Sequence, residues 1–390
     1  MPAPLNVIVS TLEVNSPDSA QSASEEPDFG ESSSSNRNDT PSSSDTEHTD
    51  PSRFEYEPSV CSVTSSIREE LLMNVHGRLV NNHSDVYHLP ADDEEISRLD
   101  HQHVMVKALV QNNYVGPVKE VLAMEDGVQK SILDLGCGTG LWAYEMAVEF
   151  PHCEIVGVDL APVQDSSSER TGLPNCRIEV DDINLGLEHF YGCFDMVHAR
   201  FITSGIKDYY GLVDHISKIL RPGGLFLSME AEFAVYDKDK NYLLSYEHGH
   251  PRHSWAADYC HSLGKAMRMR MGHIDATQLL EGWLGDHHAF EEVEKRDIWV
   301  PCGPWCPPNS RHADHLNFVG KLMQQDVLSL ISAGRPLLLG AGMKDVDVDA
   351  LMRNAGEEIS EIKQTNYFRI QCVWARKSKD IPVSAPPVLA

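Results

Sequence analysis

The sequence has no run of about 18 apolar residues, the length that a helix needs to cross a membrane. Basic residues are also scarce, since 32 lysines and arginines stand against 59 aspartates and glutamates, which gives a net charge of −27. A protein that grips DNA or RNA through its phosphates is normally basic over its binding face. The composition therefore argues against a membrane protein and against direct nucleic-acid binding.

Targeting and disulfide signals are missing as well. The first residues, MPAPLNVIVS, lack a basic region followed by a long apolar core, so we expect no secretory signal. The nine cysteines are odd in number and scattered without a framework, which is typical of a reducing compartment. We therefore expect a soluble intracellular protein whose 390 residues hold about two domains, or one large domain and a tail.

The first 60 residues have the composition of a disordered segment. They contain 12 acidic residues, 2 basic residues and 14 serines, but only three aromatic residues. Such a segment cannot bury enough apolar surface to offset the entropy that is lost on ordering. We expect a disordered acidic tail over residues 1–62, in which Ser16, Thr40 and the serines at 42–44 are candidate phosphorylation sites. A solvated tail without any switch is the alternative.

Two helices are predicted between this tail and the first strand. Leu71, Leu72 and Val75 recur at helical spacing, and Gly77 can end the first helix. The second helix is expected over Asp92–Val110, because acidic residues in its first turn interact favourably with the helix dipole.

A strand–helix–strand pattern begins at residue 131. The apolar run 131–136, the helical stretch 141–150 and the second apolar run 154–160 make a βαβ unit within about 30 residues. Such a unit predicts an α/β fold, in which helices cover a parallel sheet. Further strands are expected at 177–180, 194–198, 224–229 and 367–375, and a helix over 212–220 is expected to end in the turn sequence 221–224.

A glycine-rich loop joins the first strand of this unit to its helix. The segment Asp134–Gly140 reads DLGCGTG, and glycines there let the backbone take a positive φ and let a ligand approach closely. The next strand ends in Asp159, 23 residues after Gly136, where a carboxylate can bind both hydroxyls of a ribose. A third strand ends in Asp181 and Asp182, which adds a second acidic position at the same sheet edge.

The spacing of the glycines distinguishes two kinds of cofactor. Dinucleotide-binding loops follow the pattern G-x-G-x-x-G, whereas this loop is G-x-G-x-G with Leu141 in the place of the third glycine. Asp134 also suits a ligand with an ammonium group better than one with phosphates. S-adenosylmethionine (SAM) has an ammonium, a ribose and no phosphate, so we predict a SAM site. A dinucleotide oxidoreductase and a purely structural glycine turn are the alternatives.

The stretch LDLGCGTGLWAYEMAVEFPHCEIVGVDLAPVQ resembles motif I and the following strand of class I SAM-dependent methyltransferases. Within that class, the chain resembles the fungal LaeA-like group, which includes regulators of secondary metabolism. The resemblance covers roughly residues 66–380, and the segments that carry it beyond motif I are HGR (76–78), YHLPADDEEISRLDHQH (87–103), PNCRIEVDDI (174–183), FDMVHARFITSGIKDY (194–209), LRPGG (220–224) and VPCGPWCP (300–307). It implies a Rossmann-like, seven-stranded class I methyltransferase fold whose last strand is antiparallel.

The same resemblance implies which residues bind SAM. Its methionine part would be cradled by Asp134, Gly136, Gly138 and Gly140. Its adenosine would be bound by Asp159 at the ribose hydroxyls, Leu160 against the adenine, Asp182 at the adenine amino group and Ile183 beside the ring. One departure from the family pattern follows Asp182, where the expected tryptophan is missing and the chain continues with NLGLEHF.

Candidate catalytic residues follow the later strands. Methyl transfer is an in-line displacement at the sulfonium methyl, so the protein has to hold the acceptor in line and remove its proton where it carries one. His198 and Glu230 are candidate bases, and Arg200 is a candidate partner of the cofactor carboxylate. A hydrogen-bonded strand histidine and a surface ion pair are the structural alternatives. Further polar side chains expected to fold over the site from the preceding helices are Tyr87, Arg98 and His103.

The expected domain organisation is a single methyltransferase domain between two tails. Its parts are a helical lead-in (63–128), a SAM-binding core (129–231), an insertion over the substrate side (232–297) and C-terminal helices with the final strand (298–380), followed by a tail (381–390). Cys302, Cys306, His312 and His315 have spacings too short for an ordinary zinc site, so we expect a turn-rich loop there and no metal.

Members of the resembled group divide by function. Some resemble nuclear regulators that act with velvet-type partner proteins, and others resemble pathway enzymes that methylate small metabolites on oxygen or nitrogen. The phosphorylatable tail favours a regulator with an unidentified methyl acceptor, in the nucleus, the cytoplasm or both. A SAM-binding interaction scaffold with little turnover is the alternative from a different functional class.

Overall fold

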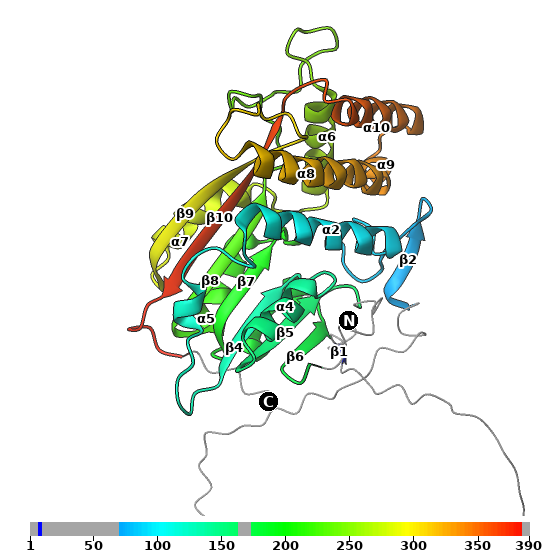
Figure 1. Ribbon diagram of the computed structural model, residues 1–390. Coiled ribbons are helices and arrows are strands. Elements are labelled where there is room, and N and C mark those ends of the chain that lie inside the picture. The colour runs from blue at the N-terminus through cyan, green and yellow to red at the C-terminus, as the bar shows by residue number, and fades with distance from the viewer. Residues whose placement is uncertain (1–6, 10–69, 163–172, 384–390) are drawn as a thin grey trace, which may run out of the picture.

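The computed structural model describes residues 7–9, 70–162 and 173–383, and its centre is an eight-stranded sheet (Figure 1). From edge to edge the strands run in the order β1, β6, β5, β4, β7, β8, β10, β9. Their bounds are β1 Val7–Val9, β4 Lys130–Leu135, β5 Cys153–Asp159, β6 Cys176–Val180, β7 Phe194–Arg200, β8 Leu220–Ala231, β9 Phe290–Pro301 and β10 Tyr367–Lys377.

The pairing directions of the strands follow the predicted fold. Strands β6, β5, β4, β7 and β8 are parallel, and β10 lies antiparallel between β8 and β9. The predicted α/β fold with an antiparallel last strand is therefore confirmed. The seven strands other than β1 form the expected methyltransferase sheet.

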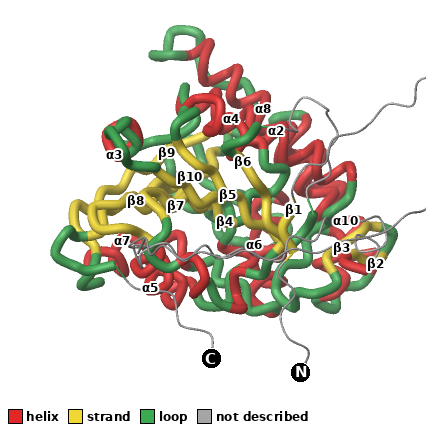
Figure 2. The backbone as a smooth tube through the Cα atoms, turned by 90° about the horizontal axis from the view of Figure 1, so that it is seen from below, coloured by secondary structure: helices red, strands yellow, loops and turns green. Residues whose placement is uncertain are grey.

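Helices cover both faces of the sheet, as the view from below in Figure 2 shows. The helices are α2 Asp93–Val110, α3 Val118–Val121, α4 Leu141–Glu149, α5 Tyr209–Ile219, α6 Trp255–Met269, α7 Ala276–Asp286, α8 Ala313–Ala333, α9 Arg335–Gly340 and α10 Asp345–Ser360, with short 3-10 turns η1 Ile183–Leu185, η2 Glu188–Phe190 and η3 Thr203–Gly205. Ile132 packs with α4 on one face, and its neighbour Leu133 packs with α5 and α7 on the other. β4 is apolar at both positions because successive side chains of a strand point to opposite faces.

A third group of helices lies beyond the strand ends, at the top of Figure 1. Helices α2, α6, α8, α9 and α10 share an apolar cluster that includes Met105, Leu263 and Val327. Helix α2 begins where the sequence predicted, because the side chain of Asp92 accepts a hydrogen bond from the amide of Glu95 at 3.1 Å. No helix in the described parts of the chain is long and apolar enough to cross a bilayer.

The first predicted helix is wrong over its second half. Leu72–Val75 is strand β2, which pairs antiparallel with β3, Arg78–Asn81. Between them His76 and Gly77 have φ angles of 51° and 86°. Two consecutive residues with positive φ form a tight hairpin turn, which the helical spacing of the apolar residues did not reveal.

The sheet also differs from the prediction at its edges. Val7–Val9 lie inside the predicted tail and pair with β6. The other residues of that tail lie outside those described. Strand β9 begins at Phe290, inside the segment 232–297 that we expected to be an insertion. It is an edge strand with the sequence FEEVEKRDIWVP, in which exposed charged residues fill most of the first eight positions, so no apolar run marks its start. Strand β8 starts at Leu220, because the expected turn forms an irregular stretch of strand instead.

Candidate functional site

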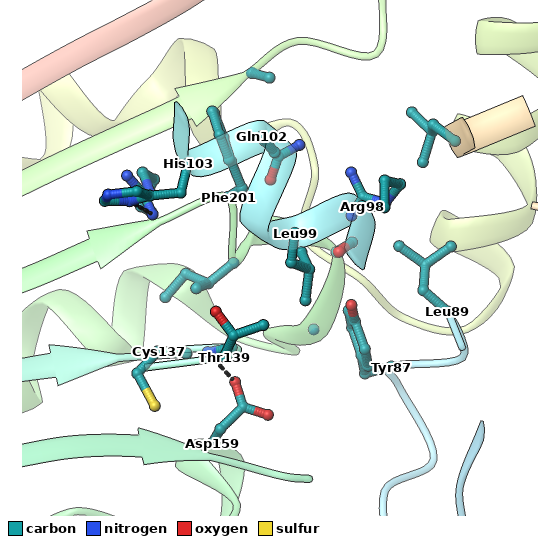
Figure 3. Close-up of a pocket in the computed structure, with 18 of the residues that line it drawn as sticks. Tyr87, Leu89, Arg98, Leu99, Gln102, His103, Cys137, Thr139, Asp159 and Phe201 are labelled. Carbon is teal, nitrogen blue, oxygen red and sulfur yellow. Dashed lines mark hydrogen bonds between the residues drawn. The ribbon is translucent and has the colours of Figure 1, made fainter. Parts of the chain in front are cut away.

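A cavity lies between the carboxyl ends of the parallel strands and helices α2 and α8 (Figure 3). Its strand side includes Gly136, Cys137, Gly138, Thr139, Asp159, Leu160, Asp181, Asp182, Ile183, Asn184, Arg200, Phe201 and Ile202. Its helix side includes Tyr87, Leu89, Arg98, Leu99, Gln102, His103, Met323, Asp326, Val327 and Leu330. Ligands of open α/β sheets bind at this end of the strands.

The glycine loop after β4 presents backbone to the cavity. Gly136 and Gly138 line it with φ angles of 68° and 58°, which glycine adopts without strain. A Cβ atom at Gly136 would collide with the side chain of Ile202, and one at Gly138 would lie 3.5 Å from Cδ1 of Leu99. Gly140, with a φ of 72°, lies at the start of α4 outside the cavity lining. The loop leaves room for a ligand because its first two glycines have no side chain.

Asp159 ends β5 with its carboxylate at the cavity. One oxygen accepts a hydrogen bond from the amide of Gly138 at 2.8 Å, and the other accepts one from the amide of Ala161 at 3.0 Å. Burial raises the pKa of Asp159 to about 6, although both hydrogen bonds favour the carboxylate. The glycine loop therefore orients this carboxylate directly, and Leu160 lines the cavity beside it.

The two acidic residues after β6 both line the cavity, but one of them also caps a turn. Asp182 accepts hydrogen bonds from the backbone and side-chain amides of Asn184, each at 2.9 Å. The side chain of Asn184 also donates to the carbonyl of Gly205 at 2.8 Å, and it accepts from the amide of Lys207. Asn184 thus ties the loop after β6 to the loop after β7. It begins the segment in which we noted the missing tryptophan, and its function was not predicted.

Arg200 ends β7 and lines the cavity as a cation without a described carboxylate partner. Burial lowers the pKa of Arg200. Its guanidinium donates to Nδ1 of His103 at 3.2 Å, and Nε2 of His103 lies 3.2 Å from the carboxylate of Glu145. Burial lowers the pKa of His103 to about 4, so this ring is neutral at pH 7. Within the described residues Arg200 forms no ion pair, so its charge can meet an anionic ligand.

The two candidate bases, His198 and Glu230, are buried and do not line the cavity. His198 is buried, its Nδ1 lies 2.7 Å from the carboxylate of Asp134, and its ring stacks on Trp142. Burial lowers the pKa of His198 although the Asp134 carboxylate opposes this shift. Glu230 accepts hydrogen bonds from the amide of Ile202 at 3.1 Å and the hydroxyl of Tyr209 at 3.3 Å, and burial raises its pKa to about 8. The cavity lining includes neither of the two candidate bases nor Asp134.

The structure brings the three expected side chains of the lead-in to the cavity. Arg98 and His103 come from α2, and Tyr87 precedes this helix (Figure 3). Arg98 forms ion pairs with Glu95 at 2.7 Å and with Asp326 at 2.9 Å. Asp326 belongs to α8 and lies 228 residues from Arg98 in the sequence. No local pattern marks this residue, so sequence analysis missed it.

The segment that we weighed as a zinc site folds as a loop between β9 and α8. Cys302 and Cys306 are buried in this loop, and His312 precedes α8 with a φ of 62°. Across residues 70–162 and 173–383, no three His, Cys, Asp or Glu side chains gather closely enough to hold a metal ion.

Comparison with known proteins identifies relatives over most of the chain. Residues 111–268 match the family described as "Methyltransferase domain". The chain is 40% identical to "Secondary metabolism regulator laeA" of Coprinopsis cinerea over 314 residues, which are 80% of this chain and 75% of that protein. It is 29% identical to "Methyltransferase pytC" of Aspergillus terreus, covering 73% of this chain and 80% of that protein.

Two further similarities are more distant. The chain is 27% identical to "Protein-methionine methyltransferase laeA" of Emericella nidulans, covering 56% of this chain and 54% of that protein. Among solved structures it matches Haemonchus contortus phosphoethanolamine N-methyltransferase 2 in complex with S-adenosyl-L-methionine. That match has 18% identity and a TM-score of 0.39, and it covers 72% of this chain and 57% of the other.

Proposed function

This chain belongs to the LaeA family of SAM-dependent methyltransferases, and we propose that it is a regulator of secondary metabolism that methylates a protein methionine. The name of the Coprinopsis cinerea relative supports regulation, and the name of the Emericella nidulans relative supports a methionine acceptor. The catalytic unit in this proposal is residues 63–380.

The residues of the cavity fit SAM. Gly136 and Gly138 leave room for its methionine part, and Arg200 binds the methionine carboxylate because no described carboxylate neutralises it. The oriented carboxylate of Asp159 binds the ribose hydroxyls, and the adenine lies against Leu160, Asp182 and Ile183. When bound, SAM supplies an electrophilic sulfonium methyl group.

Four of the expected site residues do not contact SAM in this proposal but position other parts of the site. Asp134 and His198 support the glycine loop as a buried pair, and Gly140 starts helix α4 after that loop. Glu230 positions the turn after β7, because it binds the amide of Ile202, whose side chain lines the cavity.

The surroundings of the candidate bases favour an acceptor that loses no proton. His198 and Glu230 do not line the cavity, and Nδ1 of His103, which carries the basic lone pair of the neutral ring, accepts from Arg200. Methylation of oxygen or nitrogen in a small metabolite usually needs a base. A thioether sulfur needs none, because it becomes a sulfonium when it takes the methyl group. This observation carries the proposal of a methionine acceptor.

The proposal includes a nuclear site of action and a velvet-type protein partner. Both rest on the resemblance to the LaeA-like regulators, and the name of the relative at 40% identity supports only the regulation of secondary metabolism. The protein that carries the methionine acceptor is unidentified.

The test is methyl transfer from tritiated SAM to fungal proteins, catalysed by the purified full chain. Hydrolysis of the labelled protein should release S-methylmethionine, and Asp159→Ala should abolish both SAM binding and labelling. Label on oxygen or nitrogen would make the chain a methyltransferase of another acceptor class. SAM binding without any transfer would make it an interaction scaffold.

A further inference from the structure

A buried cluster of charges forms part of the helix side of the cavity. Arg98 of α2 binds both carboxylate oxygens of Glu95, and a third nitrogen of its guanidinium binds Oδ1 of Asp326 at 2.9 Å. The second oxygen of Asp326 accepts from the side chain of Gln102 at 3.1 Å. Glu95, Arg98 and Asp326 are each no more than 6% exposed.

The charges of this cluster do not balance. Two carboxylates face one guanidinium, and the fourth member, Gln102, is neutral. A buried excess charge is costly unless an opposite charge compensates it. Of the two carboxylates bound to Arg98, Asp326 lines the cavity and Glu95 does not, so a compensating cation can reach Asp326 from the cavity.

Apolar and aromatic side chains line the cavity together with Asp326 and other polar residues such as Glu232. Phe201, Phe233 and Phe368 line the cavity with Val327 of the same helix as Asp326. Aromatic faces attract cations, and the apolar surface suits an uncharged group before methyl transfer. The opposite, strand side holds the glycine loop and Asp159, where the cofactor binds in the proposed function.

We propose that Asp326, held in place by Arg98 and Gln102, selects an acceptor that is neutral before methyl transfer and cationic after it. In the transfer, a lone pair of the acceptor sulfur forms the new bond to the methyl carbon. The bond from that carbon to the SAM sulfur breaks, and its electron pair stays on the SAM sulfur, which leaves neutral S-adenosylhomocysteine. The positive charge thereby moves to the acceptor, where the carboxylate of Asp326 stabilises it, and no proton is released.

This inference rests on the proposed function, and its test separates the two. The full chain is first saturated with S-adenosylhomocysteine, and failure of this binding step would count against the proposed function. The saturated protein is then titrated calorimetrically with the amide of N-acetyl-S-methylmethionine, a sulfonium, and with the amide of N-acetylhomoleucine, its neutral carbon isostere. We expect the sulfonium to bind about tenfold more tightly, which is about 1.4 kcal/mol.

Two matched variants test whether Asp326 causes the preference for the sulfonium. Asp326→Asn should bind the two probes equally while it keeps its affinity for S-adenosylhomocysteine. Asp314→Asn removes the same charge from an exposed position of the same helix and should keep the preference. Equal affinity of the unmodified chain for both probes would overturn the inference without any variant, as would an unchanged preference in a folded Asp326→Asn protein.

Discussion

His198 of β7 and Asp134 of β4 stand directly opposite each other in neighbouring parallel strands, with Nδ1 of the histidine 2.7 Å from a carboxylate oxygen. Both side chains are buried, and the ring of His198 stacks on Trp142 with a centroid distance of 3.7 Å. The pair lies just before the glycine loop, so it fixes the strand end from which Gly136 departs. A residue that sequence alone made a candidate base thus supports the glycine loop.

His198→Leu should destabilise the protein strongly, because it leaves the Asp134 carboxylate buried without its partner. Loss of one member of a buried pair costs about 3–5 kcal/mol. Asp134→Asn should cost clearly less, because the amide oxygen can accept the same hydrogen bond. Urea denaturation of the two variants measures the difference. Equal losses would show that the histidine does not stabilise a buried charge.

Arg200→Met should weaken SAM binding through the loss of one specific contact, the contact with the methionine carboxylate. We expect a loss of about 10- to 100-fold, typical of a hydrogen-bonded charge pair. Decarboxylated SAM should bind the variant and the unmodified chain equally. Calorimetry with both ligands provides the comparison, and Arg296→Met, at an exposed position of β9, is the control. An equal loss for both ligands would place the carboxylate elsewhere.

The parts of the fold that sequence predicted have local signals. Strands β4 and β5 are apolar on both faces, and the glycines between them serve a backbone conformation that few other residues adopt. The residues that we propose to bind the cofactor follow strand ends, so their approach to one cavity followed from the topology. Gly136, Asp159 and Asp182 therefore needed no knowledge of distant contacts.

The rest depends on contacts that the sequence does not mark. The pairing of Arg98 with Asp326 requires two helices far apart in the chain to meet over the cavity. His198 meets Asp134 because the pairing register of β7 with β4 puts the two residues opposite each other. The alternation of residues along a strand does not reveal this register or the face on which a side chain lies. The first two thirds of edge strand β9 are largely exposed and charged, so this part of its pairing with β10 left no apolar pattern.

Gly136→Ala should abolish SAM binding through a steric contact. Alanine at this position combines a positive φ of 68° with a collision between Cβ and the side chain of Ile202. Gly127→Ala tests the backbone strain of a positive φ alone, because Gly127 has a φ of 76° and a Cβ atom added there would have no neighbour within 4 Å. Both variants should lose about 1–2 kcal/mol of stability from the backbone alone. Only Gly136→Ala should lose SAM affinity in calorimetry, and full affinity there would mean that the loop does not contact the cofactor.

Glu230→Gln should become more stable relative to the unmodified chain as the pH rises. Burial raises the pKa of Glu230 to about 8 in the folded protein, whereas the unfolded value is about 4.3. The folded state therefore binds the proton more tightly, and this contribution to stability is complete below about pH 4 and is lost progressively as the pH rises to about 8. Glutamine keeps the shape without titrating, so the difference in unfolding free energy between the two proteins should move in favour of the variant from about pH 5.5 to about pH 8. Urea denaturation at both pH values measures it, with Glu294→Gln on the exposed edge strand as control. A difference that does not change with pH would mean that Glu230 is already ionised at the lower pH in the folded protein.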